Sequence, residues 1–372
     1  MRKNTNLSMP RGASPRAWRV LVAGVATAGL LGGCVQLGPQ ALSTGRPLYN
    51  VAVQQTESQQ LLLNIVRQRY SDPVLFLDVT SIASGFTWQA SAGVEGTYSS
   101  GDANTATGTL GALVSESPFI TYAPNTGEKF VTQMLTPVDL STVALVVQAG
   151  WSIERVLLII GASVNDVRNT PTGKDDQNGH VRFREVVSAL RDLQRSGMLS
   201  VGAEPDQGSD DPGFILLFDP AAVDSAPYRT ICESIKVACD GGPLRLRQAV
   251  GVSSDGETMA LATRSLFSSL YYLAQGIEVP EADLASGSAS RSAFATGSPF
   301  EQTGAQESIF RVRASESEPE FASVKVFYRN QWFYIDDRDA DSKTTFALVS
   351  MLQMLQSGET SAITPLITLP AN

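Results

Sequence analysis

The chain has 372 residues, of which 43% are apolar, and it carries 28 basic against 37 acidic residues. This apolar fraction is ample for globular folding, and the length exceeds what one small core usually organises, so we expect two packed lobes. The net charge is −9 and no stripe of Lys and Arg interrupts it, which argues against nucleic acid as a partner.

The first residues have the layout of an export signal. Several basic residues precede an uncharged apolar run from Val20 to Leu31. A spanning helix needs about 20 apolar residues, so a cleaved signal peptide over residues 1–33 fits better. The run leads into Leu31-Gly32-Gly33-Cys34, which resembles the lipobox of bacterial lipoproteins. We therefore expect Cys34 to be acylated; the alternative is an ordinary signal peptide followed by a chance cysteine. A start at Met9 would leave the lipobox intact.

Residue 35 bears on which membrane holds the lipid. It is Val, whereas Asp at this position is the familiar inner-membrane retention signal of Gram-negative lipoproteins. By that resemblance the outer membrane is favoured, with the protein lipid-anchored and its domain facing the periplasm. Acyl chains such as palmitate anchor a protein through about 0.8 kcal/mol per buried CH₂ group. Loss of residues 1–33 removes five basic residues and no acidic ones, which leaves a net charge of −14.

Residues 34–50 are rich in Gly, Pro, Ser and Gln and are expected to form a flexible tether. An N-terminal α+β lobe over residues 51–220 follows. Its expected elements are a helix at 54–70, strands at 74–80 and 86–98, a hairpin of 119–122 with 129–134, helices at 137–147 and 153–161, and a polar loop at 165–179. The stretch 90–117, mostly Gly, Ala, Ser and Thr, is either a long hairpin or a mobile loop.

The segment near 181–218 has a winged-helix-like pattern. A helix over 183–195 ends at Gly197, and strands at 198–203 and 214–218 follow across an Asp- and Gly-rich turn. Many DNA-binding proteins use this arrangement. Export and the acidic balance make a DNA-binding role improbable here, so we interpret the segment as a shape without that function.

A C-terminal α+β lobe is expected over residues 221–372. Its elements are a strand at 244–250, a helix at 257–274, a flexible loop at 282–308, a hairpin of 323–328 with 332–335, and a helix at 344–355. The fold class is thus α+β, with mixed helices and short antiparallel sheets in two packed lobes.

Two cysteines remain besides Cys34. Cys232 and Cys239 would lie in an oxidising compartment, which favours a structural disulfide between them. On one continuous helix their Cα atoms would be about 10 Å apart, so a bridge requires a turn between them. Two buried free thiols are the alternative, and neither case implies catalysis.

Sequence motifs for catalysis are missing. The single histidine, His180, falls in a polar stretch that is a poor place for a preorganised base, and no nucleophile elbow, zinc motif, P-loop or dinucleotide fingerprint is present. No cofactor is expected.

The best polar group is Asp336, Asp337, Asp339 and Asp341, of which the last three are weak metal candidates. An EF-hand fails because Ser342 replaces the glycine and Leu348 the final glutamate. We instead expect Asp341 or Ser342 to cap the last helix.

Three stretches carry a further resemblance: residues 61–67 leading into Asp72-Pro73, residues 264–280, and residues 332–346. Together they resemble a family of uncharacterised proteobacterial outer-membrane lipoproteins, which implies an envelope protein and supplies no catalytic residue. We expect non-enzymatic binding or scaffolding in the periplasm, with the membrane and other envelope proteins as partners. One alternative is an oligomeric component of an outer-membrane export or pore assembly, with the 90–117 hairpin joining copies. A periplasmic hydrolase using Asp337 or His180 is the other.

Overall fold

The computed structural model describes residues 37–97, 105–169, 177–204, 213–248, 256–289 and 309–357. The fold is α+β, as expected. The chain divides after Glu57 into two compact units, and the core described below belongs to the unit that begins at Ser58. Among the described residues, no helix combines the length and the apolar character needed to cross a membrane. Cys34 and the signal segment lie outside these ranges.

Helix α2 (Leu37–Arg69) occupies most of the expected tether. The tether prediction was wrong from Leu37 onward, because extending an existing helix costs far less than starting one. Pro39 lies in the first turn, where its missing N–H is not needed, although Pro47 lies inside the helix. The last turns of α2 anchor the helix in the core through Leu61, Leu62, Ile65 and Val66, all buried.

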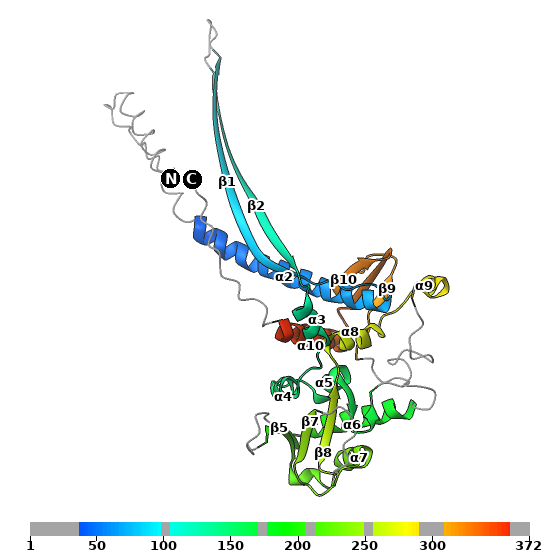
Figure 1. The fold of residues 1–372 in the computed structure, drawn as a ribbon. Coiled ribbons are helices and arrows are strands. Elements are labelled where there is room, and N and C mark those ends of the chain that lie inside the picture. The colour runs from blue at the N-terminus through cyan, green and yellow to red at the C-terminus, as the bar shows by residue number, and fades with distance from the viewer. Residues whose placement is uncertain are drawn as a thin grey trace, which may run out of the picture. The chain divides into compact units, whose positions relative to one another are not determined.

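Strands β1 (Leu77–Thr97) and β2 (Thr105–Pro124) form one long antiparallel hairpin, seen as the two long curving arrows in Figure 1. This decides the choice between hairpin and loop in favour of the hairpin. The expected second hairpin is wrong, because residues 119–122 pair with β1 and residues 129–134 lie in helix α3 (Glu128–Leu135). Phe130 and Met134 lie one helical turn apart, and both pack on the core from one face of α3. A spacing of four residues fits a helix as well as a strand, so the sequence pattern alone could not separate the two.

The core sheet has six strands in the order β4-β3-β8-β7-β6-β5, and only β7 and β8 pair in parallel. The elements of this region are α4 (Leu140–Gln148), α5 (Ile153–Ile160), β3 (Gly161–Val164), β4 (Val167–Arg168), α6 (Gln177–Arg195), β5 (Leu199–Ala203), β6 (Phe214–Phe218), the 3-10 helix η1 (Pro220–Ala222), α7 (Ala226–Ile235), β7 (Leu244–Gln248) and β8 (Thr258–Thr263). The expected polar loop at 165–179 is wrong at both ends, where β4 and the start of α6 lie.

The winged-helix-like segment consists of α6 and the β5–β6 hairpin, as its pattern indicated. The hairpin does not stand alone as a wing, because β6 also pairs with β7 and the hairpin forms one edge of the six-stranded sheet. The same pairing crosses the expected lobe boundary at residue 220, so the regions 51–220 and 221–372 share this sheet.

The helix expected at 257–274 is only half helical. Thr258–Thr263 forms β8, and helix α8 (Leu266–Ala274) begins after Ser265, whose hydroxyl accepts the Ser268 N–H. Residues 258–261 are all buried in the middle of the sheet. A short, continuously apolar run fits a buried strand as well as a helix, so periodicity could not separate the two.

The C-terminal elements are α9 (Glu281–Ser286), β9 (Arg313–Ser315), β10 (Ala322–Tyr328), β11 (Gln331–Asp336) and α10 (Ala340–Ser357). The β10–β11 hairpin is confirmed; its turn residues Arg329 and Asn330 have φ of 48° and 62°, as a type I′ turn requires. The loop expected at 282–308 is helical in α9, and its remainder from residue 290 lies outside the described residues.

Helix α10 is fastened to α5 by an arginine whose side chain is 11% exposed. Arg155 forms an ion pair with Asp341, and its guanidinium also donates to the Asp341 carbonyl oxygen and the Thr345 hydroxyl, each at 2.7 Å. Thr345 in turn donates to the carbonyl of Ile309 at 2.5 Å. Helix α10 is therefore an integral part of the core.

Candidate functional site

The β1–β2 hairpin is the first candidate, because its backbone is unusually exposed to pairing. In the part of the chain that the structure describes, its sheet contains only these two strands, of 21 and 20 residues. Each strand uses one edge for its partner, so the outer edges carry a row of N–H and C=O groups with no neighbouring strand. At about 3.3 Å per residue the hairpin is roughly 65 Å long.

The register gives the hairpin two unlike faces. Residues directly opposite each other in an antiparallel pair share a face, and successive residues alternate between faces. On one face lie the pairs Leu77/Pro124, Val79/Tyr122, Ile82/Ile120, Ser84/Pro118, Phe86/Glu116, Trp88/Val114, Ala90/Ala112, Ala92/Leu110, Val94/Gly108 and Gly96/Ala106. We call this the apolar face. The opposite or hydroxyl face is dominated by Ser and Thr, with Leu113 and Phe119 as its large apolar residues.

A bulge keeps the apolar face continuous. The register shifts between Val79 and Ser81, so that Thr80 is an extra residue on β1. Without that shift, Leu77 and Val79 would fall on the opposite face from Ile82, because a one-residue slip exchanges the faces of a strand. With it, Val79 and Ile82 lie opposite Tyr122 and Ile120, which are two residues apart on β2.

The base of the hairpin is clamped by α2. The Gln60 side chain accepts from the Leu77 N–H at 2.7 Å and donates to its carbonyl at 3.1 Å. One turn further on, the fully buried Asn64 makes the same pair of bonds with Leu75, at 3.1 Å and 2.7 Å. Two side-chain amides on one face of α2 thus bond the backbone N–H and C=O groups of Leu75 and Leu77, just as the backbone of a neighbouring strand would. Near this base Phe119, Ile120 and Tyr122 are 76%, 44% and 56% exposed.

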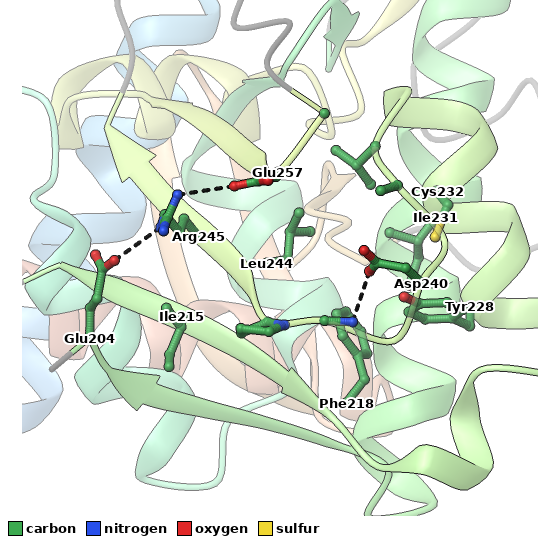
Figure 2. Close-up of a pocket in the computed structure, with 15 residues that line it drawn as sticks. Glu204, Ile215, Phe218, Tyr228, Ile231, Cys232, Asp240, Leu244, Arg245 and Glu257 are labelled. Atoms are coloured by element: carbon green, nitrogen blue, oxygen red, sulfur yellow. Dashed lines mark hydrogen bonds and ion pairs between the residues drawn. The ribbon is translucent and has the colours of Figure 1, made fainter.

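A pocket of about 370 Å³ is the second candidate (Figure 2). It lies among β6, β7, α7 and the segment 237–243, with Phe218, Tyr228, Ile231 and Leu244 in its wall. At its rim Arg245 bonds Glu204 at 3.1 Å and Glu257 at 3.2 Å (Figure 2). Arg247 also pairs with Glu204, and it is the main cause of the lowered pKa of that carboxyl. The two arginines therefore neutralise Glu204 and Glu257, while Asp240, which also lines the pocket, accepts the Gly242 N–H at 2.9 Å.

Asn165 holds the pocket wall in place. Its amide donates to the carbonyl of Ile235, at the end of α7, at 2.8 Å. Its oxygen accepts the Ala260 N–H of β8 at 2.7 Å, and its own N–H donates to the Ala260 carbonyl at 2.8 Å. The residue is 6% exposed and has φ of 49°, a left-handed conformation that Asn tolerates better than most residues.

The two remaining cysteines both line or flank this pocket. Cys232 is buried and Cys239 exposed, and both are free thiols, so the expected disulfide is not formed in this structure. The turn that a bridge requires is present, because α7 ends at Ile235. Burial, followed by the Cys239 contact, raises the pKa of Cys232 to about 12. A thiol that stays protonated at neutral pH is a poor nucleophile.

His180 lies in the first turn of α6, not in the loop expected from the sequence. Burial, followed by the charge of Arg184, lowers its pKa to about 4. A general base works best with a pKa near the operating pH, so this environment suits a neutral structural histidine better than a catalytic one.

The aspartates are separately engaged. Asp337 pairs with Lys343 at 2.7 Å, and Asp341 pairs with Arg155. Asp339 accepts from the Ser342 N–H at 3.0 Å and from its hydroxyl at 2.7 Å. The cap of α10 is thus Asp339, one turn before Ser342, and not Asp341 or Ser342 as expected. No group of side chains within the described ranges could hold a metal ion.

Comparison with models of protein families, with curated proteins and with solved structures gave no match to this chain. The candidate sites therefore stand on their geometry. The pocket was missed from the sequence because Glu204, Arg245 and Glu257 are far apart along the chain. The faces of the hairpin were missed because the sequence alone does not show which residues of β2 lie opposite which residues of β1. Only the register of the two strands places the apolar residues from Ile82 onward on one common face.

Proposed function

We propose that this chain is a lipid-anchored protein of the bacterial cell envelope that acts by non-enzymatic binding or scaffolding through its β1–β2 hairpin. The observation that carries the proposal is the hairpin, whose two strands pair with no further strand in the described part of the chain and whose register gives it two unlike faces. Cys34, in its lipobox-like context, is the proposed attachment to the outer membrane, with the domain in the periplasm.

The chemistry of the remaining sites supports a binding role. The arginines at the pocket rim are engaged by Glu204 and Glu257, the Cys232 thiol is held protonated, and the ring nitrogens of His180 are buried and its pKa is low. None of these groups is placed beside a second group that would activate it as a nucleophile or a base. Binding through backbone edges needs no such group, because the strand supplies the donors and acceptors itself.

The test compares two exposed phenylalanines in cells. The photoreactive residue p-benzoylphenylalanine replaces Phe119, in the hairpin, or Phe321, which is 52% exposed just before β10. After irradiation we expect cross-linked adducts from position 119 and none from position 321. Equal adducts from both positions, or none from position 119, would contradict the proposal. Incorporation of labelled palmitate, lost in Cys34→Ala, tests the anchor in the same strains.

A further inference from the structure

The outer edges of the hairpin lack the features by which proteins prevent strand pairing. Natural edge strands are blunted by Lys, by Pro, or by charges that point inward. From Ile82 to Thr97 and from Thr105 to Ser117 the two strands contain no Lys, Arg or Pro, and their only charged residues are Glu95 and Glu116. A two-stranded ribbon is marginal by itself in water, so strands of such length gain most by adding further strands at both edges.

The apolar face has a segment with the length of a membrane crossing. Beyond the Phe86/Glu116 pair, toward Thr97 and Thr105, no charged residue falls on this face from Trp88 to Gly96 or from Ala106 to Val114. That is about nine residues on each strand, and a tilted strand needs about 9–11 to cross a bilayer. Phe86 and Trp88 lie at one end of the segment, where strands that cross membranes carry aromatic residues at the lipid–water boundary.

The hydroxyl face of the same segment suits water. Opposite residues on this face include Thr87/Ser115, Ser91/Gly111, Gly93/Thr109 and Glu95/Thr107. Apolar and polar residues therefore alternate along most of both strands, with an interruption on β2 where Gly111 and Leu113 fall on the hydroxyl face. Such alternation is the pattern of a strand with lipid on one side and an aqueous lumen on the other.

We propose that copies of this chain pair edge to edge through β1 and β2 into a closed sheet that crosses a lipid bilayer, with the apolar face on the acyl chains and the hydroxyl face lining a water-filled lumen. The inference rests on the proposed function, because it names the partner that the hairpin binds: further copies of the same chain. Each copy contributes two strands, and closed membrane sheets have about eight strands or more, so at least about four copies are needed.

Adjacent residues on β2 provide a matched pair of variants. Leu110 falls on the apolar face opposite Ala92, in the middle of the segment, and Thr109 on the hydroxyl face opposite Gly93. An arginine on the lipid face near the bilayer centre costs enough to reduce insertion about thirtyfold to a thousandfold, whereas the lumen face accepts it. Leu110→Arg should therefore abolish insertion and Thr109→Arg should not. Both variants place the same cation on the same strand, one residue apart.

The experiment uses the full acylated chain, purified in mild detergent. Light scattering measures its mass, and the protein is then reconstituted into phosphatidylethanolamine–phosphatidylglycerol vesicles that hold a small fluorescent dye. We expect a particle of at least about four copies, with dye efflux from the wild type and from Thr109→Arg but not from Leu110→Arg. The thermal unfolding midpoint of each variant shows that the rest of the chain remains folded.

The outcomes separate this inference from the proposed function. A monomer in detergent, or equal effects of the two arginine variants on efflux, would overturn the closed sheet. If cross-linked adducts from position 119 then join this chain to a different protein, the hairpin is still a binding element and only the self-assembly fails. Adducts whose mass is a multiple of this chain alone support the assembly. A monomer in detergent that also gives no adducts would contradict both the closed sheet and the binding role of the hairpin.

Discussion

His180 makes the stability of this protein depend on pH in a predictable direction. Its pKa falls from 6.5 in the unfolded chain to about 4 in the folded one, chiefly because of burial. Between pH 4 and pH 6.5 the unfolded chain therefore binds more protons at His180 than the folded chain does. The free energy of unfolding is thus highest above pH 6.5 and decreases as the pH falls toward 4. The full shift corresponds to about 3 kcal/mol, and at pH 5 we expect the folded state to be about 2 kcal/mol less stable than at pH 7.5.

The chain suits this measurement because His180 is its only histidine. No other side chain has an ordinary pKa between pH 5 and pH 7.5. Urea unfolding followed by tryptophan fluorescence, at pH 5 and at pH 7.5, gives the free energy of unfolding for the wild type and for His180→Gln. The variant should lose most of the difference between the two pH values. An equal loss of stability in both proteins would show that His180 is not buried as the structure has it.

Three further predictions concern separate parts of the chain. Asn165→Ala leaves two buried backbone groups without partners and should cost about 2–6 kcal/mol in urea unfolding. Asn330→Ala, at a similar positive φ but exposed, should cost only ~1 kcal/mol, and equal costs would refute the role of the hydrogen bonds. The pKa of Asp72 is lowered in the folded protein, first by the hydrogen bond from the Tyr328 hydroxyl. The ionised carboxylate therefore stabilises the folded state above pH 3.8, and this contribution is lost as the pH falls through the lowered pKa. Asp72→Asn should therefore flatten acid unfolding below about pH 4, and an unchanged acid limb would contradict this. Glu95 falls on the hydroxyl face, so in planar bilayers Glu95→Gln should lower the ratio of K⁺ to Cl⁻ permeability, and an unchanged ratio would argue against a lumen there.

Elements with an unambiguous period could be predicted from the sequence. The β10–β11 hairpin is one, because alternating strands flank Arg329 and Asn330 in a two-residue turn. The helix α6 is another, since its apolar residues recur at helical spacing up to Gly197. In both cases local chemistry and tertiary burial favour the same structure.

Elements decided by distant partners could not be predicted. Residues 258–263 form a strand because β3 and β7 lie on either side of them, and neither neighbour is visible in the local pattern. The same holds for the hairpin faces, since the extra residue Thr80 matters only once β2 fixes the register. Cys232 and Cys239 are free thiols in this structure, and the formation of a disulfide between them depends on oxidation, which their spacing does not encode.

The fastening of α10 to α5 sets the order in which the protein can mature. A chain made from its N-terminus completes the β1–β2 hairpin early, because all of its paired residues lie between Leu77 and Pro124. The core must wait for α10, since Arg155 can contact Asp341 and Thr345 only after the residues up to Thr345 have been made. A nascent chain released before residue 340 therefore presents two open strand edges without a finished body behind them, a state prone to aggregate. Premature termination should thus be more harmful here than in a protein whose hairpins are made last.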